Sequence, residues 1–177
     1  MRCFLYFLTY SFIGFLLETG YSLVTTGGFV AKKCFIFSFL CPVYGLGALA
    51  ILWTAGKLVH HPFLVFLVGA VVATVVEYGV GAFYRQVFGF RIWNYSDMPL
   101  NINGHVCLLF TFFWGILSLI LVYLVHPHIQ RYTSYVPGKM CIVLLSLFIL
   151  DAIASTAVLM HYHEKQALNL TWILKNV

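Results

Sequence analysis

The chain has 177 residues, of which 62% are hydrophobic and 8% are charged, and its mean hydropathy is +0.96. A soluble domain carries about 25% charged residues, so this composition excludes a water-soluble globular protein and predicts a polytopic membrane protein. The formal net charge of +5 comes from Lys and Arg residues that stand singly or in pairs between apolar runs, which excludes the basic stripe of a nucleic-acid-binding protein.

Apolar runs long enough to cross a bilayer recur along the chain. A spanning helix needs about 20 mostly apolar residues. The runs that meet this requirement predict an all-α, polytopic membrane helix bundle with about five transmembrane helices, over residues 4–25, 34–56, 62–84, 106–125 and 139–160. Little length remains for a soluble domain, so we expect residues 1–177 to form a single integral-membrane domain.

The connection between the third and fourth predicted helices, residues 85–105, differs from the short turns elsewhere. Its sequence, RQVFGFRIWNYSDMPLNINGH, is rich in aromatic, amide and basic residues. It is too polar to span a bilayer and too apolar for a free linker. Irregular backbone at membrane depth must be covered by protein or water, so we expect an interfacial or re-entrant loop packed on the bundle.

Acidic residues inside the apolar runs indicate where a site lies. Glu18, Glu77 and Asp151 account for three of the five acidic residues in the chain, and all three fall within predicted helices. A charged side chain at a helix centre costs roughly 2.5–3.5 kcal/mol on insertion scales. Such residues usually face a protein interior or a wet cavity, so these positions predict a functional site.

Helix rise gives the depth of these carboxylates. Glu18 and Glu77 each lie seven residues before the end of helices that run in the same direction, about 10 Å below the side covered by the 85–105 loop. The second helix starts from this side with Tyr44 at similar depth, two residues after Pro42, which frees carbonyl groups. We therefore predict a half-membrane polar cavity built on Glu18 and Glu77.

The neighbouring loop supplies groups that could complete this cavity. Arg85 and Arg91 would be counter-charges, and Trp93, Asn94 and Tyr95 a lid. The candidate substrate- or ion-binding residues are Glu18, Tyr44, Glu77, Arg85, Arg91, Trp93, Asn94, Tyr95, Asn101 and Asp151. A purely structural interpretation stays open, because a buried ion pair can simply fix a bundle and Trp and Tyr are common at membrane interfaces.

Metal and enzyme signatures are weak in this chain. Four histidines fall on one predicted face, but they lack nearby acidic or Cys ligands, so we expect no metal site: His60, His61, His126 and His128. The motifs GxxxxGK[ST], GxSxG and SxxK do not occur, so no catalytic residue and no cofactor are expected. Whether the chain is an enzyme stays open, with a non-enzyme favoured.

Three blocks of sequence carry a family resemblance: YSFIGFLLET, GFVAKKCFIFSFLCPVYGLGAL and VVEYGVGAFYRQVFGFRIWNYSDMPLNINGHVCLLFTFFWGIL. Together, over roughly residues 7–125, they resemble a bacterial family described as "putative ABC-transporter type IV" permeases, the CmpB-like group. The family motif carries over onto Glu18, Pro42, Tyr44, Gly45, Glu77, Trp93, Tyr95, Ser96, Asn101, Gly104 and Trp114. Two positions depart from it, since Asn94 stands where the family usually has Asp and His105 where Arg or Lys is common.

The resemblance implies a multi-pass permease subunit of the bacterial inner membrane. Its implied partners are the lipid bilayer, a separate ATPase subunit and further copies of the chain, with no nucleic acid. Two other functions remain open. An intramembrane enzyme could use Glu77 or Glu18 as general base on a lipid-linked substrate held by Arg85 and Arg91, or the bundle could be a non-catalytic scaffold or sensor.

Overall fold

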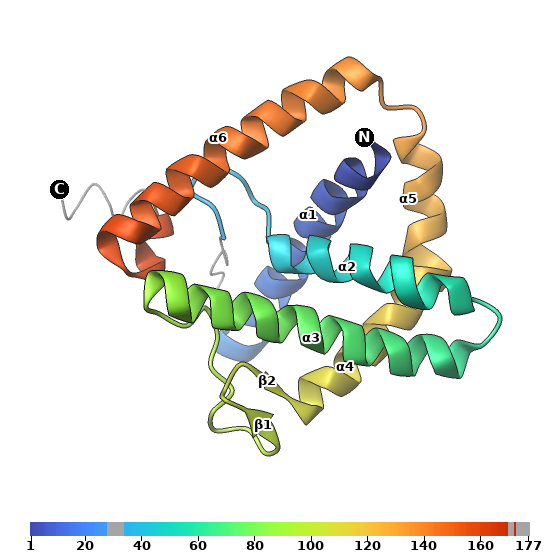
Figure 1. The fold of residues 1–177 in the computed structure, drawn as a ribbon, viewed down its shortest axis with the longest axis horizontal. Coiled ribbons are helices and arrows are strands. Elements are labelled where there is room, and N and C mark those ends of the chain that lie inside the picture. Colours follow the sequence, from blue (N-terminus) through green and yellow to red (C-terminus); the bar gives the residue numbers. More distant parts are fainter. Residues whose placement is uncertain (28–33, 170–171, 173–177) are drawn as a thin grey trace. The chain divides into compact units, whose positions relative to one another are not determined.

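The computed structural model describes residues 1–27, 34–169 and 172. Its α-helices are α1 (Arg2–Thr26), α2 (Pro42–Thr54), α3 (Pro62–Phe88), α4 (Leu108–Leu119), α5 (His126–Thr133) and α6 (Gly138–Tyr162). Its shorter elements are the 3₁₀ helices η1 (Ala55–Leu58) and η3 (Lys165–Leu168), the π-helical η2 (Ile120–Val125), and the strands β1 (Asn101–Ile102) and β2 (Val106–Cys107). Figure 1 shows the β1–β2 hairpin in the connection from α3 to α4.

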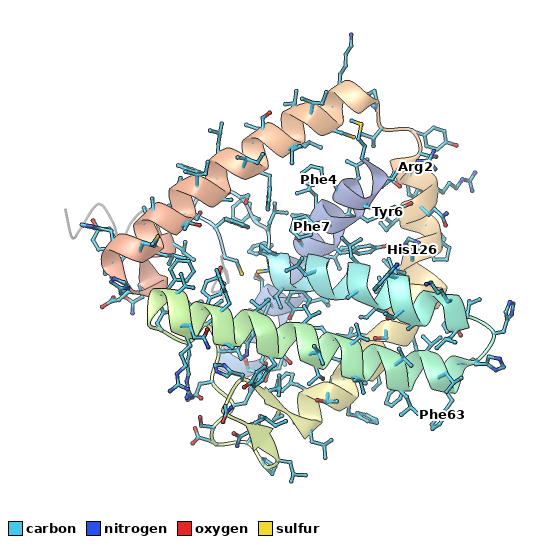
Figure 2. The ribbon with its side chains drawn as sticks, in the orientation of Figure 1. Arg2, Phe4, Tyr6, Phe7, Phe63 and His126 are labelled. Atoms are coloured by element: carbon cyan, nitrogen blue, oxygen red, sulfur yellow. The ribbon has the colours of Figure 1, made fainter. Side chains whose placement is uncertain are left out.

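Long apolar helices dominate the fold. Within the described residues, four helical stretches are long and apolar enough to cross a membrane: Arg2–Thr25, Pro62–Phe88, Leu108–Thr133 and Gly138–Tyr162. Many large apolar side chains on them face outward, such as Phe63, which is 71% exposed and points away from the start of α3 in Figure 2. The predicted all-α membrane bundle is confirmed, and the chain is a multi-pass membrane protein.

The second predicted helix is shorter than the expected 34–56. It begins at Pro42 and has 13 residues, about 20 Å of helix, which is less than the roughly 30 Å of a hydrocarbon core. Pro42 fits the first turn because that turn needs no N–H donor there. The preceding residues 34–40 adopt an irregular path instead of a helix.

The fourth predicted helix is longer than the expected 106–125. It runs as α4, η2 and α5 from Leu108 to Thr133, and η2 ends at Val125, two residues before Pro127. Proline has no N–H and its ring clashes with the carbonyl one turn earlier. The wider π-helical turn accommodates this local change without ending the span.

The described contacts divide the chain into two compact units. The first comprises Met1–Gly45 and Val136–Val177, and the second comprises Leu46–Tyr135. We describe each unit by itself. The assignment of residues 1–177 to one domain stays a prediction.

Aromatic packing joins the helices of the first unit. The rings of Phe4 and Phe7, labelled on α1 in Figure 2, lie 6.0 and 5.4 Å from the ring of Phe148 on α6. Phe35, from the irregular segment, lies 5.6 Å from the same ring. Offset and edge-to-face ring pairs contribute about 0.5–1.5 kcal/mol beyond their buried area. Phe148 is therefore a shared contact for α1, α6 and the irregular segment.

Small residues allow α3 and α4 to pack closely in the second unit. The buried residues of α3 that recur every four positions are Val65, Gly69, Ala73, Glu77 and Gly81. Ser118 of α4 is fully buried and lies directly against Gly69, and the ring of Phe66 lies against Gly115. Glycine at such positions lets two membrane helices approach, because van der Waals contact is the main attraction between them in lipid.

We expect Gly69→Ala to destabilise the protein by about 1–3 kcal/mol, because the added methyl group would overlap the Cβ and Oγ atoms of Ser118. Gly79→Ala on the same helix is the matched control, since its methyl group would meet no described atom within 4 Å. Thermal unfolding of both variants in one detergent measures the difference. Equal melting temperatures would contradict the α3–α4 packing described above.

Candidate functional site

The second unit contains a buried carboxylate. Glu77 of α3 is only 4% exposed. Its Oε1 atom accepts a hydrogen bond of 3.0 Å from the Tyr95 hydroxyl, and its Oε2 atom accepts one of 2.8 Å from the indole Nε1 of Trp114. The donors come from the 89–107 loop and from α4. One intramembrane carboxylate thus connects two helices and the loop.

The local structure explains how these groups meet. Glu77 occupies the buried stripe of α3 that packs against α4, and Trp114 lies on α4 one turn after Phe110. The Tyr95 ring stacks on Phe110 with 4.7 Å between ring centroids and an interplanar angle of 23°. Stacking fixes the ring, so the hydroxyl is directed to Glu77. A buried carboxylate requires such donors because its desolvation is otherwise unfavourable.

The loop beside this cluster has its own polar network. The Nη1 atom of Arg91 donates to Asn94 Oδ1 at 2.7 Å and to Ser96 Oγ at 2.9 Å. The Ser96 backbone N–H and hydroxyl both donate to Asn94 Oδ1, at 3.2 and 2.7 Å. Asn94 Oδ1 therefore accepts the hydrogen bonds that close this turn of the loop. It also accepts a hydrogen bond from the Arg91 guanidinium, although the Asn94 side chain is uncharged.

The hairpin completes this network. Asn101 pairs with Cys107 and Ile102 with Val106 in an antiparallel register. The Asn101 side chain donates to the Ser96 and Met98 carbonyl groups at 3.2 and 2.8 Å and accepts from the Gly104 N–H at 3.0 Å. Asn101 thus orders the loop backbone.

Only glycine fits at position 104, for two reasons. Its φ of +70° is strained for other residues, and a Cβ atom there would lie 2.7 Å from Arg91 Nη1 and 2.9 Å from Asn94 Oδ1. The Gly104 backbone therefore lies directly against the Arg91 and Asn94 side chains.

His105 connects the loop to α3. Its backbone carbonyl accepts a 2.7 Å hydrogen bond from Trp93 Nε1, and its ring lies edge-on to Tyr78 and against Gly81. Burial lowers the pKa of the imidazole, and the positive charges of Arg91 and Arg85 lower it further. His105 is thus neutral at neutral pH, with two guanidinium groups close enough to act on it.

The first unit holds a second carboxylate that accepts a hydrogen bond from a tyrosine. The Tyr44 hydroxyl donates to Glu18 Oε1 at 2.8 Å, and the Tyr44 ring covers Gly14 of α1. Gly45 lies against Ser11 and the Phe7 carbonyl on the same helix. The predicted proximity of Glu18 and Tyr44 is therefore present. A cavity shared with Glu77 stays a prediction, because Glu77 belongs to the other unit.

Asp151 binds the backbone of the irregular segment. Its carboxylate accepts from the N–H groups of Phe37 and Ser38, at 3.2 and 2.7 Å, and from the Ser155 hydroxyl at 3.1 Å. Ser155 Oγ in turn accepts from the Ile36 N–H at 3.0 Å. These bonds satisfy amides that the missing helical turns leave unpaired. The sequence indicated a site at Asp151, but not this backbone partner.

The structure groups the sequence-predicted residues into smaller sets than expected. Glu77 meets Tyr95, Arg91 meets Asn94, and Glu18 meets Tyr44. Trp114, Ser96 and His105 contribute to these sets although the sequence reasoning did not name them as binding residues; Trp114 was signalled only by its place in the family motif. Among the described residues, no group of three or more His, Cys, Asp or Glu side chains is placed to hold a metal ion.

We expect Asp151→Asn to speed hydrogen exchange at the Phe37 and Ser38 amides by about tenfold or more, because a hydrogen bond to a charged acceptor contributes about 1.5–3 kcal/mol. Exchange measured by mass spectrometry on a peptide covering residues 34–40 tests this. The exposed Glu164 gives a matched control, Glu164→Gln. Unchanged exchange in the Asp151 variant would show that the carboxylate does not hold the segment.

Comparison with known proteins assigns the family. No curated protein and no solved structure matches the chain. The family described as "Putative ABC-transporter type IV" matches residues 5–156, which include Glu18, Glu77, Asp151 and the whole 85–105 loop. The match covers most of the sequence and agrees with the resemblance carried by the motifs. This chain belongs to that CmpB-type family of multi-pass membrane proteins.

Proposed function

We propose that the chain is the membrane subunit of a transporter, in which Glu77 binds the transported solute or a coupled cation. The observation that carries this proposal is a carboxylate, 4% exposed, in the middle of a long apolar helix. Ionisable residues in such positions are costly, and they commonly mark ion or substrate pathways. The family description points to the same class of protein.

The Glu77–Tyr95 hydrogen bond suggests how binding could move the loop. Tyr95 belongs to the 89–107 loop, whereas Glu77 belongs to a span. A solute with a cationic or N–H group would compete with the Tyr95 hydroxyl for Oε1. Binding would then release Tyr95 from α3, and solute departure would restore the bond. Occupancy of the site would thus be coupled to the position of the loop.

Energy must come from outside this chain if the transporter uses ATP. The sequence has no P-loop motif, so a separate ATP-hydrolysing subunit is part of the proposal. The four long spans found among the described residues enclose little volume, so self-association of the chain is also part of the proposal. The bacterial inner membrane, implied by the family resemblance, is the proposed location.

The Glu18–Tyr44 pair is the second candidate position for solute binding. It repeats the chemistry of the Glu77 cluster, a carboxylate in a span that accepts from a tyrosine hydroxyl. Asp151 is a weaker candidate, because its oxygens already accept two backbone N–H groups and the Ser155 hydroxyl.

Purification of the protein with its native lipids and partners tests the proposal. We expect an ATP-hydrolysing subunit to co-purify, and we expect Glu77→Gln to lower ATP hydrolysis by the complex about tenfold or more without dissociating it. Loss of one hydrogen bond to a charged group costs about 1.5–3 kcal/mol, and each 1.4 kcal/mol corresponds to a factor of ten.

One control variant and two possible outcomes separate the parts of this proposal. Glu164→Gln makes the same chemical change at an exposed position and should leave ATP hydrolysis unchanged. If only copies of the chain co-purify, the proposed ATP-driven transport is wrong. If the complex forms and Glu77→Gln hydrolyses ATP at the normal rate, the subunit assignment stands and the site at Glu77 is wrong.

A further inference from the structure

We infer that Arg85 and Arg91, beside His105, form a binding site for a phosphate group, supplied by an anionic lipid headgroup or by free phosphate. This inference goes beyond the proposed function and does not rest on it. It concerns the end of α3 and the 89–107 loop, all within the second unit.

Arg91 is held in place with donors remaining. Its Nη1 atom donates to Asn94 and Ser96 and lies against the backbone of Gly104. A guanidinium has five N–H donors, two of them on Nη1. Among the residues that the structure describes, Asn94 and Ser96 supply the only acceptors to which the Arg91 guanidinium donates a hydrogen bond. The edge formed by Nε and Nη2 can therefore receive two oxygens of one ligand.

Arg85 brings a second positive charge to the same place. It lies on the last turn of α3, is exposed, and follows Gly81 by one helical turn. Gly81 lies against the His105 ring, and the charges of both arginines act on that ring. Among the described residues, no carboxylate is one of the groups that shift the His105 pKa. Asp97, in the same loop, is exposed.

Structural roles explain each arginine alone but not the pair. Arg85 interacts favourably with the C-terminal end of the α3 dipole, and Arg91 orders the turn at Asn94. Arg91 lies against Gly104, and Arg85 follows Gly81 by one turn, so both positive charges flank the residue pair Gly81 and His105. A bound anion would compensate these charges.

Phosphate is the anion that best fits this arrangement. The planar guanidinium fork matches phosphate oxygens in a bidentate manner, and one phosphate can bridge two guanidinium groups. The loop follows the end of a spanning helix, where lipid headgroups lie. Basic positions at the ends of membrane helices are recurrent sites for anionic headgroups.

The experiment uses the full chain in a maltoside detergent, which carries no phosphate. One arm adds sodium phosphate, with sodium chloride at equal ionic strength as reference. The other adds short-chain phosphatidylglycerol and measures bound lipid by native mass spectrometry and the melting temperature. We expect saturable binding and a raised melting temperature in at least one arm. Phosphatidylglycerol alone would identify a lipid headgroup, and an effect of phosphate alone would identify a free anion.

Variants decide whether these residues form the site. We expect Arg85→Gln to weaken binding about tenfold or more, as the loss of a charged contact implies. Arg91→Lys keeps the charge but loses the fork, and we expect weaker binding there too. Arg131→Gln removes an exposed arginine elsewhere and should bind normally. Because Arg85 is exposed, its variant should fold. No binding in either arm, or equal binding by the Arg85 variant and the unaltered protein, would overturn the inference.

Discussion

The need of a carboxylate within a membrane span for hydrogen-bond donors organises this protein. Glu77 and Asp151 are buried, and Glu18 is half-buried. Glu18, Glu77 and Asp151 lie in three different spans, and each accepts hydrogen bonds from groups outside its own helix. In hydrocarbon an unpaired carboxylate is strongly unfavourable, so the donors must be brought to it. The second helix, the loop and the irregular segment are each fixed by one of these carboxylates. Polar contacts therefore determine which segments meet, while apolar packing fills the space between them.

The three carboxylates differ in the chemistry of their donors, and this difference bears on which of them is the better candidate for binding a solute. Asp151 receives two backbone amides, which cannot leave without unfolding the 34–40 segment. Glu77 receives the side chains of Tyr95 and Trp114, whose hydrogen bonds a ligand could replace without breaking a backbone hydrogen bond. A site that must exchange a ligand requires partners of the second kind. Glu77 is the better candidate for that reason.

Asn94 and His105, where the sequence departs from the motif expected from the resemblance, are both neutral in the loop. Asn94 accepts from Arg91 through a neutral oxygen, where an aspartate would form an ion pair. His105 is buried and neutral, where a lysine or arginine would add a further charge. Because the Asn94 side chain is neutral, it does not cancel the positive charge of Arg91. The loop keeps its geometry through hydrogen bonds, while it carries one positive side chain, Arg91, and one negative side chain, Asp97.

The sequence alone determined the all-α membrane class, the position of the main spans, the intramembrane acids and the polar loop, because apolar runs and isolated charges are local features of the chain. It did not determine that residues 34–40 leave the helix, since the Asp151 and Ser155 groups that pair with those amides lie more than 100 residues away in the sequence. Nor did it indicate that Trp114 and Tyr95 would both reach Glu77, because helix rise gives depth but not rotation about the axis. Only the packing of α3 on α4, made close by Gly69 and Gly115, brought these side chains together.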